Sequence, residues 1–137
     1  MVEILNRQRK RRVPVRKLED LLQRLATHYR LKNPEMVLAF VGTKTITNLN
    51  RRFRKNDQPT DVLSFPVGQT TSEGKFYLGD IIISAPQAWK QSLGHEHSLE
   101  RELSVLTIHG FLHLLGFKHF KNIEREEEKA RRLFLGI

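Results

Sequence analysis

Residues 106–119 have the sequence Leu-Thr-Ile-His-Gly-Phe-Leu-His-Leu-Leu-Gly-Phe-Lys-His, which sets two histidines four positions apart in an apolar segment. On a helix, His109 and His113 project from one face, one turn apart. Gly116 follows three residues later, where a helix can end in a left-handed residue and the chain can fold back. His119 lies just past this turn and can approach the same point in space. The stretch therefore predicts a buried helix whose end gathers three imidazoles.

Three converging imidazoles are a typical ligand set for zinc, and they leave one coordination position open. The chain has no cysteine that could complete a closed cage, so a catalytic site is favoured over a structural one. A histidine pair on an apolar helix is often only packed and hydrogen-bonded. The full spacing His-x-x-x-His-x-x-Gly-x-x-His, however, matches the ligand frame of the metzincin proteases. We therefore expect His109, His113 and His119 to bind one zinc ion per chain.

The residue after the first histidine distinguishes this stretch from a metalloprotease. In those enzymes it is a glutamate, the base that activates the metal-bound water. Here the position is Gly110, which has no side chain. A zincin-type metalloprotease is therefore the weaker alternative. A second alternative is a ribosome-associated RNA-binding module in which the metal is only structural.

Three blocks of the chain resemble the YbeY family, bacterial metal-dependent endoribonucleases tied to ribosomal RNA maturation. The first is HGFLHLLGFKH at residues 109–119, the second is LNRRFRKNDQPTDVLSFP at residues 49–66, and the third is LGDIIIS at residues 78–84. The blocks occur in family order and, with the acidic C-terminal helix, cover most of the chain from residue 37 onward. Lys118 departs from the family, which usually has aspartate before the third histidine.

The resemblance implies a single-strand-specific, metal-dependent endoribonuclease that acts in ribosomal RNA processing and ribosome quality control. The proposed mechanism is phosphodiester hydrolysis by a metal-activated water, although attack by the RNA 2′-hydroxyl stays open. Arg54 is carried over as the catalytic residue expected near the scissile phosphate. A guanidinium suits this role because it grips two phosphate oxygens in a fork and stabilises charge in the transition state. The implied partners are ribosomal RNA and ribosome-associated proteins.

The length and composition predict one soluble domain spanning residues 1–137. Hydrophobic residues make up 39% of the chain and charged residues 28%, as in globular proteins. No apolar run approaches the roughly 20 residues that a membrane span needs. The absence of cysteine suits a reducing cytosol. We expect a cytoplasmic protein without membrane attachment, and the sequence leaves its oligomeric state open.

The formal charge of +9 is concentrated in the first half of the chain. Residues 1–61 contain 15 Lys and Arg against 6 Asp and Glu, whereas residues 62–137 contain 9 of each kind. This asymmetry favours one basic face and a polyanionic partner such as RNA. The candidates are the basic segment 7–17 and the cluster Arg51, Arg52 and Lys55. Because cations near a helix C-terminus are also stabilised by its dipole, simple capping is the alternative for the cluster.

The remaining pattern predicts an α+β fold with a mixed sheet of about four strands, about five helices and the metal site on a central buried helix. Strands are expected at residues 2–5, 36–41, 62–67 and 76–84, and helices at residues 15–29, 43–53, 85–92, 98–115 and 123–135. Pro66 predicts an edge position or a strand end for the third strand, because proline cannot donate to a ladder.

Three further polar residues precede the histidine helix or lie in its first turns. Glu102 lies two turns before His109 on the same stripe, so it could orient a ligand histidine from behind. His95 and His97 alternate in a polar loop and are expected to be surface residues rather than ligands.

Overall fold

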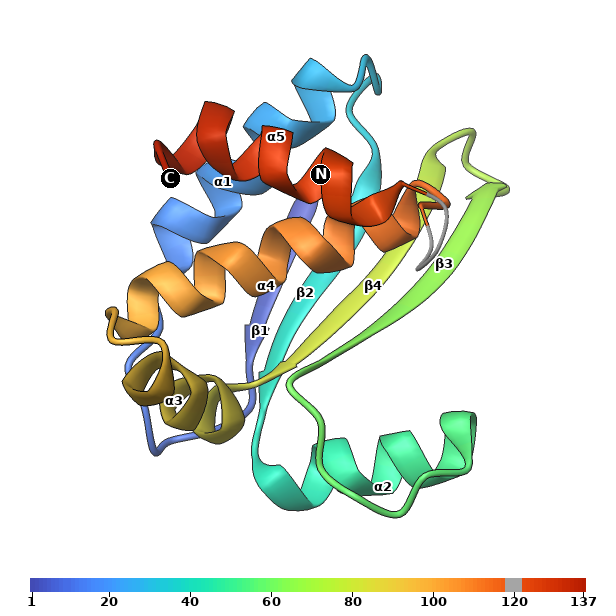
Figure 1. Ribbon diagram of the computed structural model, residues 1–137. Coiled ribbons are helices and arrows are strands. Elements are labelled where there is room, and N and C mark those ends of the chain that lie inside the picture. Colours follow the sequence, from blue (N-terminus) through green and yellow to red (C-terminus); the bar gives the residue numbers. More distant parts are fainter. Residues whose placement is uncertain (118–121) are drawn as a thin grey trace.

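The computed structural model describes residues 1–117 and 122–137 and has the predicted α+β class, with helices packed on one mixed sheet (Figure 1). The strands are β1 (Val2–Asn6), β2 (Glu35–Val41), β3 (Val62–Thr70) and β4 (Phe76–Ser84). The helices are α1 (Val15–His28), α2 (Thr43–Arg54), α3 (Ala85–Gly94), α4 (Leu99–Leu114) and α5 (Ile123–Leu135). The expectation of about four strands and five helices in one domain is confirmed over the described ranges. None of these helices combines the length and the apolar character that crossing a membrane requires.

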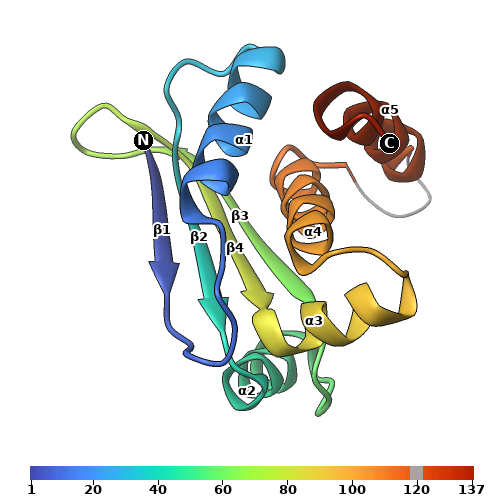
Figure 2. The ribbon, with the colours of Figure 1, turned by 90° about the vertical axis from the view of Figure 1, so that its left-hand side faces the viewer.

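β4 is a central strand of the sheet, whose order is β1-β2-β4-β3. It is parallel to β2 and antiparallel to β3, while β1 is parallel to β2. β3 forms an edge of the sheet, in agreement with Pro66, and its register with β4 shifts between Pro66 and Gln69. Beyond this shift the β3–β4 hairpin projects away from the helices (Figure 2).

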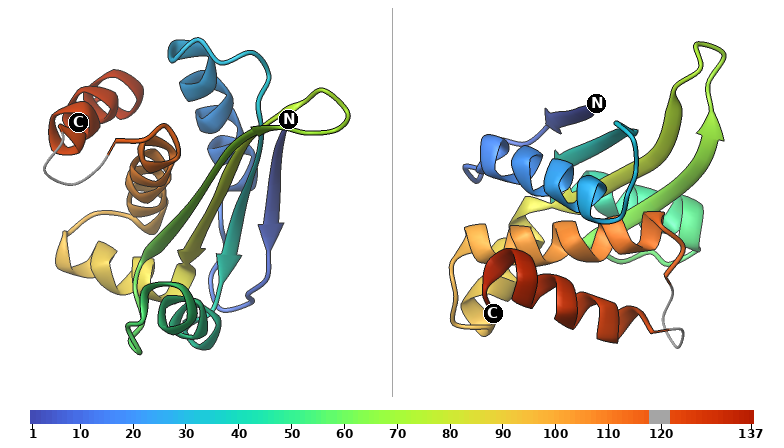
Figure 3. Two further views of the ribbon diagram at one scale, coloured as in Figure 1. Left: turned by 90° about the vertical axis from the view of Figure 1, so that its right-hand side faces the viewer. Right: turned by 90° about the horizontal axis from the view of Figure 1, so that it is seen from above.

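Two helices, α1 and α4, cover one face of the sheet, and α5 packs on the outside of α4 (Figure 2 and Figure 3). The main core lies beneath them and includes Leu22 of α1 and Phe111 of α4, both fully buried. α2 packs on the opposite face, where Ile46 joins a smaller apolar cluster with Leu63. Ile82 of β4 packs against this second cluster because neighbouring residues of a strand point to opposite faces.

Helix α4 begins and ends as the sequence predicts. The side chain of Ser98 caps its N-terminus by accepting a backbone N–H of the first turn at 3.0 Å. At the other end Gly116 has a left-handed φ of 100°. There the N–H of Phe117 donates to the carbonyl of Leu112 at 3.1 Å, and the N–H of Gly116 donates to that of His113 at 3.0 Å. The chain therefore turns back immediately after the second histidine.

At Gly110, α4 approaches the sheet closely. A Cβ atom at this position would lie 2.6 Å from Cγ2 of Ile81 and 3.3 Å from Oγ of Ser64. The Ser64 hydroxyl also donates to the Gly110 carbonyl at 3.3 Å. The glutamate that a metalloprotease carries here could enter only if the Ile81 side chain or α4 itself shifted. The missing protease base is therefore a requirement of the packing as well as a feature of the sequence.

Candidate functional site

A cleft of about 760 Å³ opens where three distant segments of the chain meet. It is lined by Phe53 and Arg54 at the end of α2, by residues 60–66 at the start of β3, and by His109, His113 and Phe117. The structure thus brings together Arg54 and two of the three predicted metal ligands. The third, His119, lies outside the described residues, as does Lys118.

The two histidines of α4 present the same nitrogen to each other. Nε2 of His113 lies 3.0 Å from Nε2 of His109, and the ring centroids are 4.5 Å apart. On the far side of its ring, His109 donates its Nδ1–H to Oε1 of Glu127. A carboxylate in this position fixes the proton on Nδ1, so Nε2 carries the lone pair. This is the arrangement that orients ligand histidines in metal sites.

The donor set fits a zinc ion. Zinc binds imidazole nitrogens at about 2.0–2.1 Å, which sets two ligand nitrogens roughly 3.3 Å apart in a tetrahedral site. The observed Nε2–Nε2 distance of 3.0 Å needs only a small opening to reach this value. Both side chains are half-buried on a rigid helix, so the geometry is held by packing rather than by a loop.

Glu127 is a functional candidate that the sequence analysis missed. It lies on α5, which packs against α4 (Figure 1), and its second oxygen, Oε2, lies 3.5 Å from Nη1 of Arg131. The two residues are four positions apart on α5, so their side chains lie one turn apart, and the ion pair holds the Glu127 carboxylate in place. The only signal in the sequence was the acidic first half of the C-terminal helix, which has four glutamates within residues 124–128. Their position relative to His109 depends on how α5 docks, which local patterns do not reveal.

Arg54 differs from Arg51 in having no carboxylate partner among the described residues. Among the side chains that the structure describes, no carboxylate pairs with it, whereas Nη1 of Arg51 lies 3.5 Å from Asp57. Lys55 forms the left-handed C-cap of α2, and the Arg52 guanidinium lies 5.7 Å from the ring of Phe53. All four cations are exposed, so an anion in the cleft could reach the Arg54 guanidinium without breaking an ion pair.

The basic segment 7–17 is partly anchored to the fold. The Arg11 guanidinium stacks over the ring of Trp89 on α3, 3.6 Å from its centroid. Lys17 forms an exposed ion pair with Glu100 at 3.0 Å. The segment is therefore attached to the same end of the domain as α3 and the start of α4.

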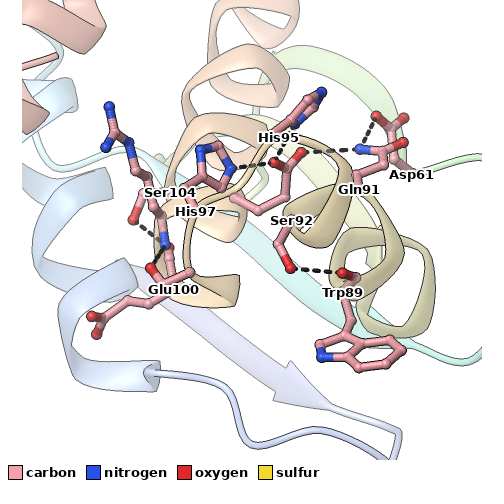
Figure 4. Close-up of polar contacts among 11 residues, drawn as sticks. Asp61, Trp89, Gln91, Ser92, His95, His97, Glu100 and Ser104 are labelled. Carbon is pink, nitrogen blue, oxygen red and sulfur yellow. Dashed lines mark hydrogen bonds and ion pairs between the residues drawn. The ribbon is translucent and has the colours of Figure 1, made fainter.

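A second pair of histidines, His95 and His97, lies at the turn between α3 and α4 (Figure 4), and both contact Glu102. His95 Nδ1 lies 2.8 Å and His97 Nε2 lies 2.6 Å from the same oxygen, Oε1. Burial raises the pKa of Glu102, but hydrogen bonds from the two histidines and Gln91 outweigh it and hold the pKa below its ordinary value. The three ligand atoms lie within 4.8 Å of one another, so this group could also bind a metal ion.

This cluster changes two expectations from the sequence. The contacts described for Glu102 go to His95, His97 and Gln91, so Glu127 rather than Glu102 contacts His109. His95 is exposed as expected, but His97 is largely enclosed, and each directs one ring nitrogen to the Glu102 carboxylate.

The comparisons with known proteins agree with the three sequence blocks. The pattern that defines the family Endoribonuclease YbeY matches residues 3–133. The Endoribonuclease YbeY of Oceanobacillus iheyensis is 43% identical over 123 residues, which cover 80% of this chain and 79% of that protein. That of Aquifex aeolicus is 40% identical over 130 residues, covering 95% of this chain and 85% of that protein. The solution structure of TM1509 from Thermotoga maritima matches with a TM-score of 0.65 and 26% identity, over 99% of this chain and 90% of that one. The chain therefore belongs to the Endoribonuclease YbeY family.

Proposed function

We propose that this protein is a metal-dependent endoribonuclease that hydrolyses phosphodiester bonds of single-stranded RNA in the cleft between α2, β3 and α4. The observation that carries the proposal is the meeting of Arg54 with the facing Nε2 atoms of His109 and His113 in one cleft. The name Endoribonuclease YbeY on the related proteins supports the choice of RNA as the substrate.

His109, His113 and His119 would hold one zinc ion per chain. Such an ion supplies a Lewis acid that acidifies water and polarises a phosphoryl oxygen. The chain's own contribution is orientation: Glu127 accepts the Nδ1–H of His109 and keeps the opposite nitrogen aimed into the cleft. Arg131 in turn holds the second oxygen of Glu127.

Arg54 is proposed to grip the scissile phosphate. Its guanidinium can donate two parallel hydrogen bonds to phosphate oxygens, and it is available because no described carboxylate pairs with it. Since charge on those oxygens increases in the transition state, a donor already in place lowers the barrier. Arg51, Arg52 and Lys55 lie on the same end of α2 and would extend the phosphate contacts along the RNA.

We further propose that the cellular substrate is ribosomal RNA, cut during its processing and in ribosome quality control, with ribosome-associated proteins as partners. The concentration of positive charge in residues 1–61 supports a polyanionic partner. The cytoplasm is the compartment that fits an RNA substrate and a chain without cysteine.

The test is incubation of the purified protein with end-labelled single-stranded RNA and with the matching duplex, each with and without a chelator. Cleavage of the single strand alone that chelator abolishes is the expected result. Intact RNA that still shifts on a native gel would instead support a binding module with a structural metal. Cleavage of an unstructured protein substrate in the same preparation would support the zincin alternative, against which Gly110 argues.

The ends of the products distinguish the two nucleophiles. Attack by the 2′-hydroxyl leaves a 2′,3′-cyclic phosphate, and a substrate with a 2′-deoxynucleotide at the cut site would then resist cleavage. Attack by water leaves linear phosphate ends and tolerates the deoxynucleotide. We expect linear ends.

A further inference from the structure

We propose that His95, His97 and Glu102 form a second metal site, separate from the cleft, which takes Zn²⁺ or a similar divalent ion and fastens the turn between α3 and α4. Two imidazoles and one carboxylate are a ligand set that zinc uses in proteins, and the fourth position would be left to water. The inference concerns metal binding alone, so it does not depend on whether the cleft cuts RNA.

The carboxylate at the centre of the group is built into the core. The Glu102 side chain is only 3% exposed, and the structure gives partners to both of its oxygens. Oε1 faces the two histidines, and Oε2 accepts a hydrogen bond from Nε2 of Gln91 at 3.0 Å. A buried carboxylate is stabilised by compensating positive charge as well as by hydrogen bonds. A divalent ion at Oε1 would supply that charge.

The backbone holds both histidines in place independently of any metal. The N–H of His95 donates to the carbonyl of Gln91 at 2.8 Å, and the N–H of His97 donates to that of Ser92 at 3.1 Å. Glu96 between them has a left-handed φ of 56°, which lets residues on either side point in the same direction. The ligand atoms therefore converge because the turn is fixed, which lowers the entropy cost of binding an ion.

Hydrogen bonds connect the three side chains. The contacts of 2.8 and 2.6 Å to Oε1 are shorter than the roughly 3.3 Å that separates ligands around tetrahedral zinc. Entry of an ion needs His95 to withdraw by about 0.5 Å and His97 by about 0.7 Å. His95 can do so because its side chain is 59% exposed, whereas His97 at 18% is the more rigid ligand. The exposed side of His95 also gives the ion its route from solvent.

The group is connected to the wall of the cleft. Nε2 of Gln91 also donates to Oδ2 of Asp61 at 3.2 Å (Figure 4). Asp61 lines the cleft, and its other oxygen accepts the N–H of Val62 at the first residue of β3. An ion on Glu102 would thus steady the residue that begins the cleft-lining strand, through a single amide side chain. Glu102 acts here on position and does not touch the reacting atoms.

The test is zinc stoichiometry by equilibrium dialysis and elemental analysis, with no RNA present. The wild-type protein is expected to retain two equivalents, and the double variant His109→Ala/His113→Ala one equivalent. Adding His97→Ala to that variant should remove the remaining ion. His28→Ala changes an exposed histidine outside both groups and serves as the matched control, for which no loss is expected.

A second measurement covers the case in which the double variant does not fold. In the otherwise unchanged chain, His95→Ala and His97→Ala should each lower the zinc stoichiometry from two to one. Glu102→Gln should have the same effect, although glutamine can still accept hydrogen bonds from both histidines. The proposal would be overturned if the wild-type protein retained one equivalent of zinc and lost it only when His113 was changed. The group would then be a hydrogen-bonded cluster without a metal. Two equivalents that persist in all three variants would overturn it as well.

Discussion

The cleft histidines and the histidines of the α3–α4 turn are built from the same residue types but arranged in opposite ways. At the cleft, Glu127 contacts Nδ1 of His109, and the Nε2 atoms of His109 and His113 face each other. At the turn, Glu102 lies between the two imidazoles and contacts Nδ1 of His95 and Nε2 of His97. The position of the carboxylate therefore distinguishes the two groups. Glu127 lies behind the cleft histidines and leaves them facing the cleft, whereas Glu102 lies between the histidines of the turn and connects them to the core.

The largest expected difference between the two groups is in RNA cleavage. His113→Ala removes a ligand that faces the cleft, so cleavage should fall to the level of the chelated protein, with loss of the ion held there. His97→Ala should reduce the rate far less, because His97 does not line the cleft. The measurement is the single-turnover rate on one labelled single-stranded RNA. Equal losses in the two variants would erase the distinction.

The next effect in size tests the other side of the cleft. Arg54→Lys keeps the charge but loses the fork, so we expect the cleavage rate to fall by about a hundredfold or more. Arg24→Lys is the control, because Arg24 pairs with Asp20 on α1 and does not line the cleft, and it should change the rate little. The effect of the Arg54 change should fall on kcat more than on KM, and bound zinc should be unaltered. If the Arg54→Lys protein cleaved RNA as fast as the parent, Arg54 would have no role in gripping the phosphate.

A smaller effect is expected from the carboxylate behind His109. Glu127→Gln should weaken zinc binding by about 10- to 100-fold, because an amide orients the imidazole less well. Glu128→Gln is a close control: it lies one residue away on the same helix and pairs with Arg132 four residues later, as Glu127 pairs with Arg131. Competition with a fluorescent chelator measures both affinities. Equal affinities in the two variants would show that the contact with His109 has no role in the site.

The smallest effect concerns acid stability at the turn. The pKa of Glu102 lies below its ordinary value of 4.5, so its ionised form is favoured in the folded state. This contribution is present above the ordinary value and is lost as the pH falls through the lowered one. Urea unfolding between neutral pH and about pH 3 should therefore show a loss that is shallower in Glu102→Gln. A slope that the substitution leaves unchanged would mean that the cluster does not stabilise the ionised carboxylate.

The features that the sequence predicted correctly are those with a local cause. The spacing of His109 and His113 places them on one helix face whatever surrounds the helix, and Gly116 ends that helix because a left-handed residue is needed there. Pro66 lies on an edge strand because it cannot donate to a ladder. Each of these follows from the backbone of one segment.

The features that the sequence did not reveal depend on tertiary packing. Glu102 shares a helical stripe with His109, but the two-turn rise separates them, and the α3–α4 turn brings closer partners to its carboxylate. Glu127 contacts His109 only because α5 packs on α4. The tight approach at Gly110 likewise depends on Ile81 of β4, a residue that no helical pattern could identify.

The most direct test of the proposed active site is zinc add-back to the stripped protein, followed by cleavage of single-stranded RNA. The expected result is that the stripped protein is inactive and that activity returns with zinc in the wild type and in His97→Ala, but not in His113→Ala. Full cleavage by the stripped protein, or recovery that requires His97 and not His113, would contradict the assignment of the cleft as the catalytic centre.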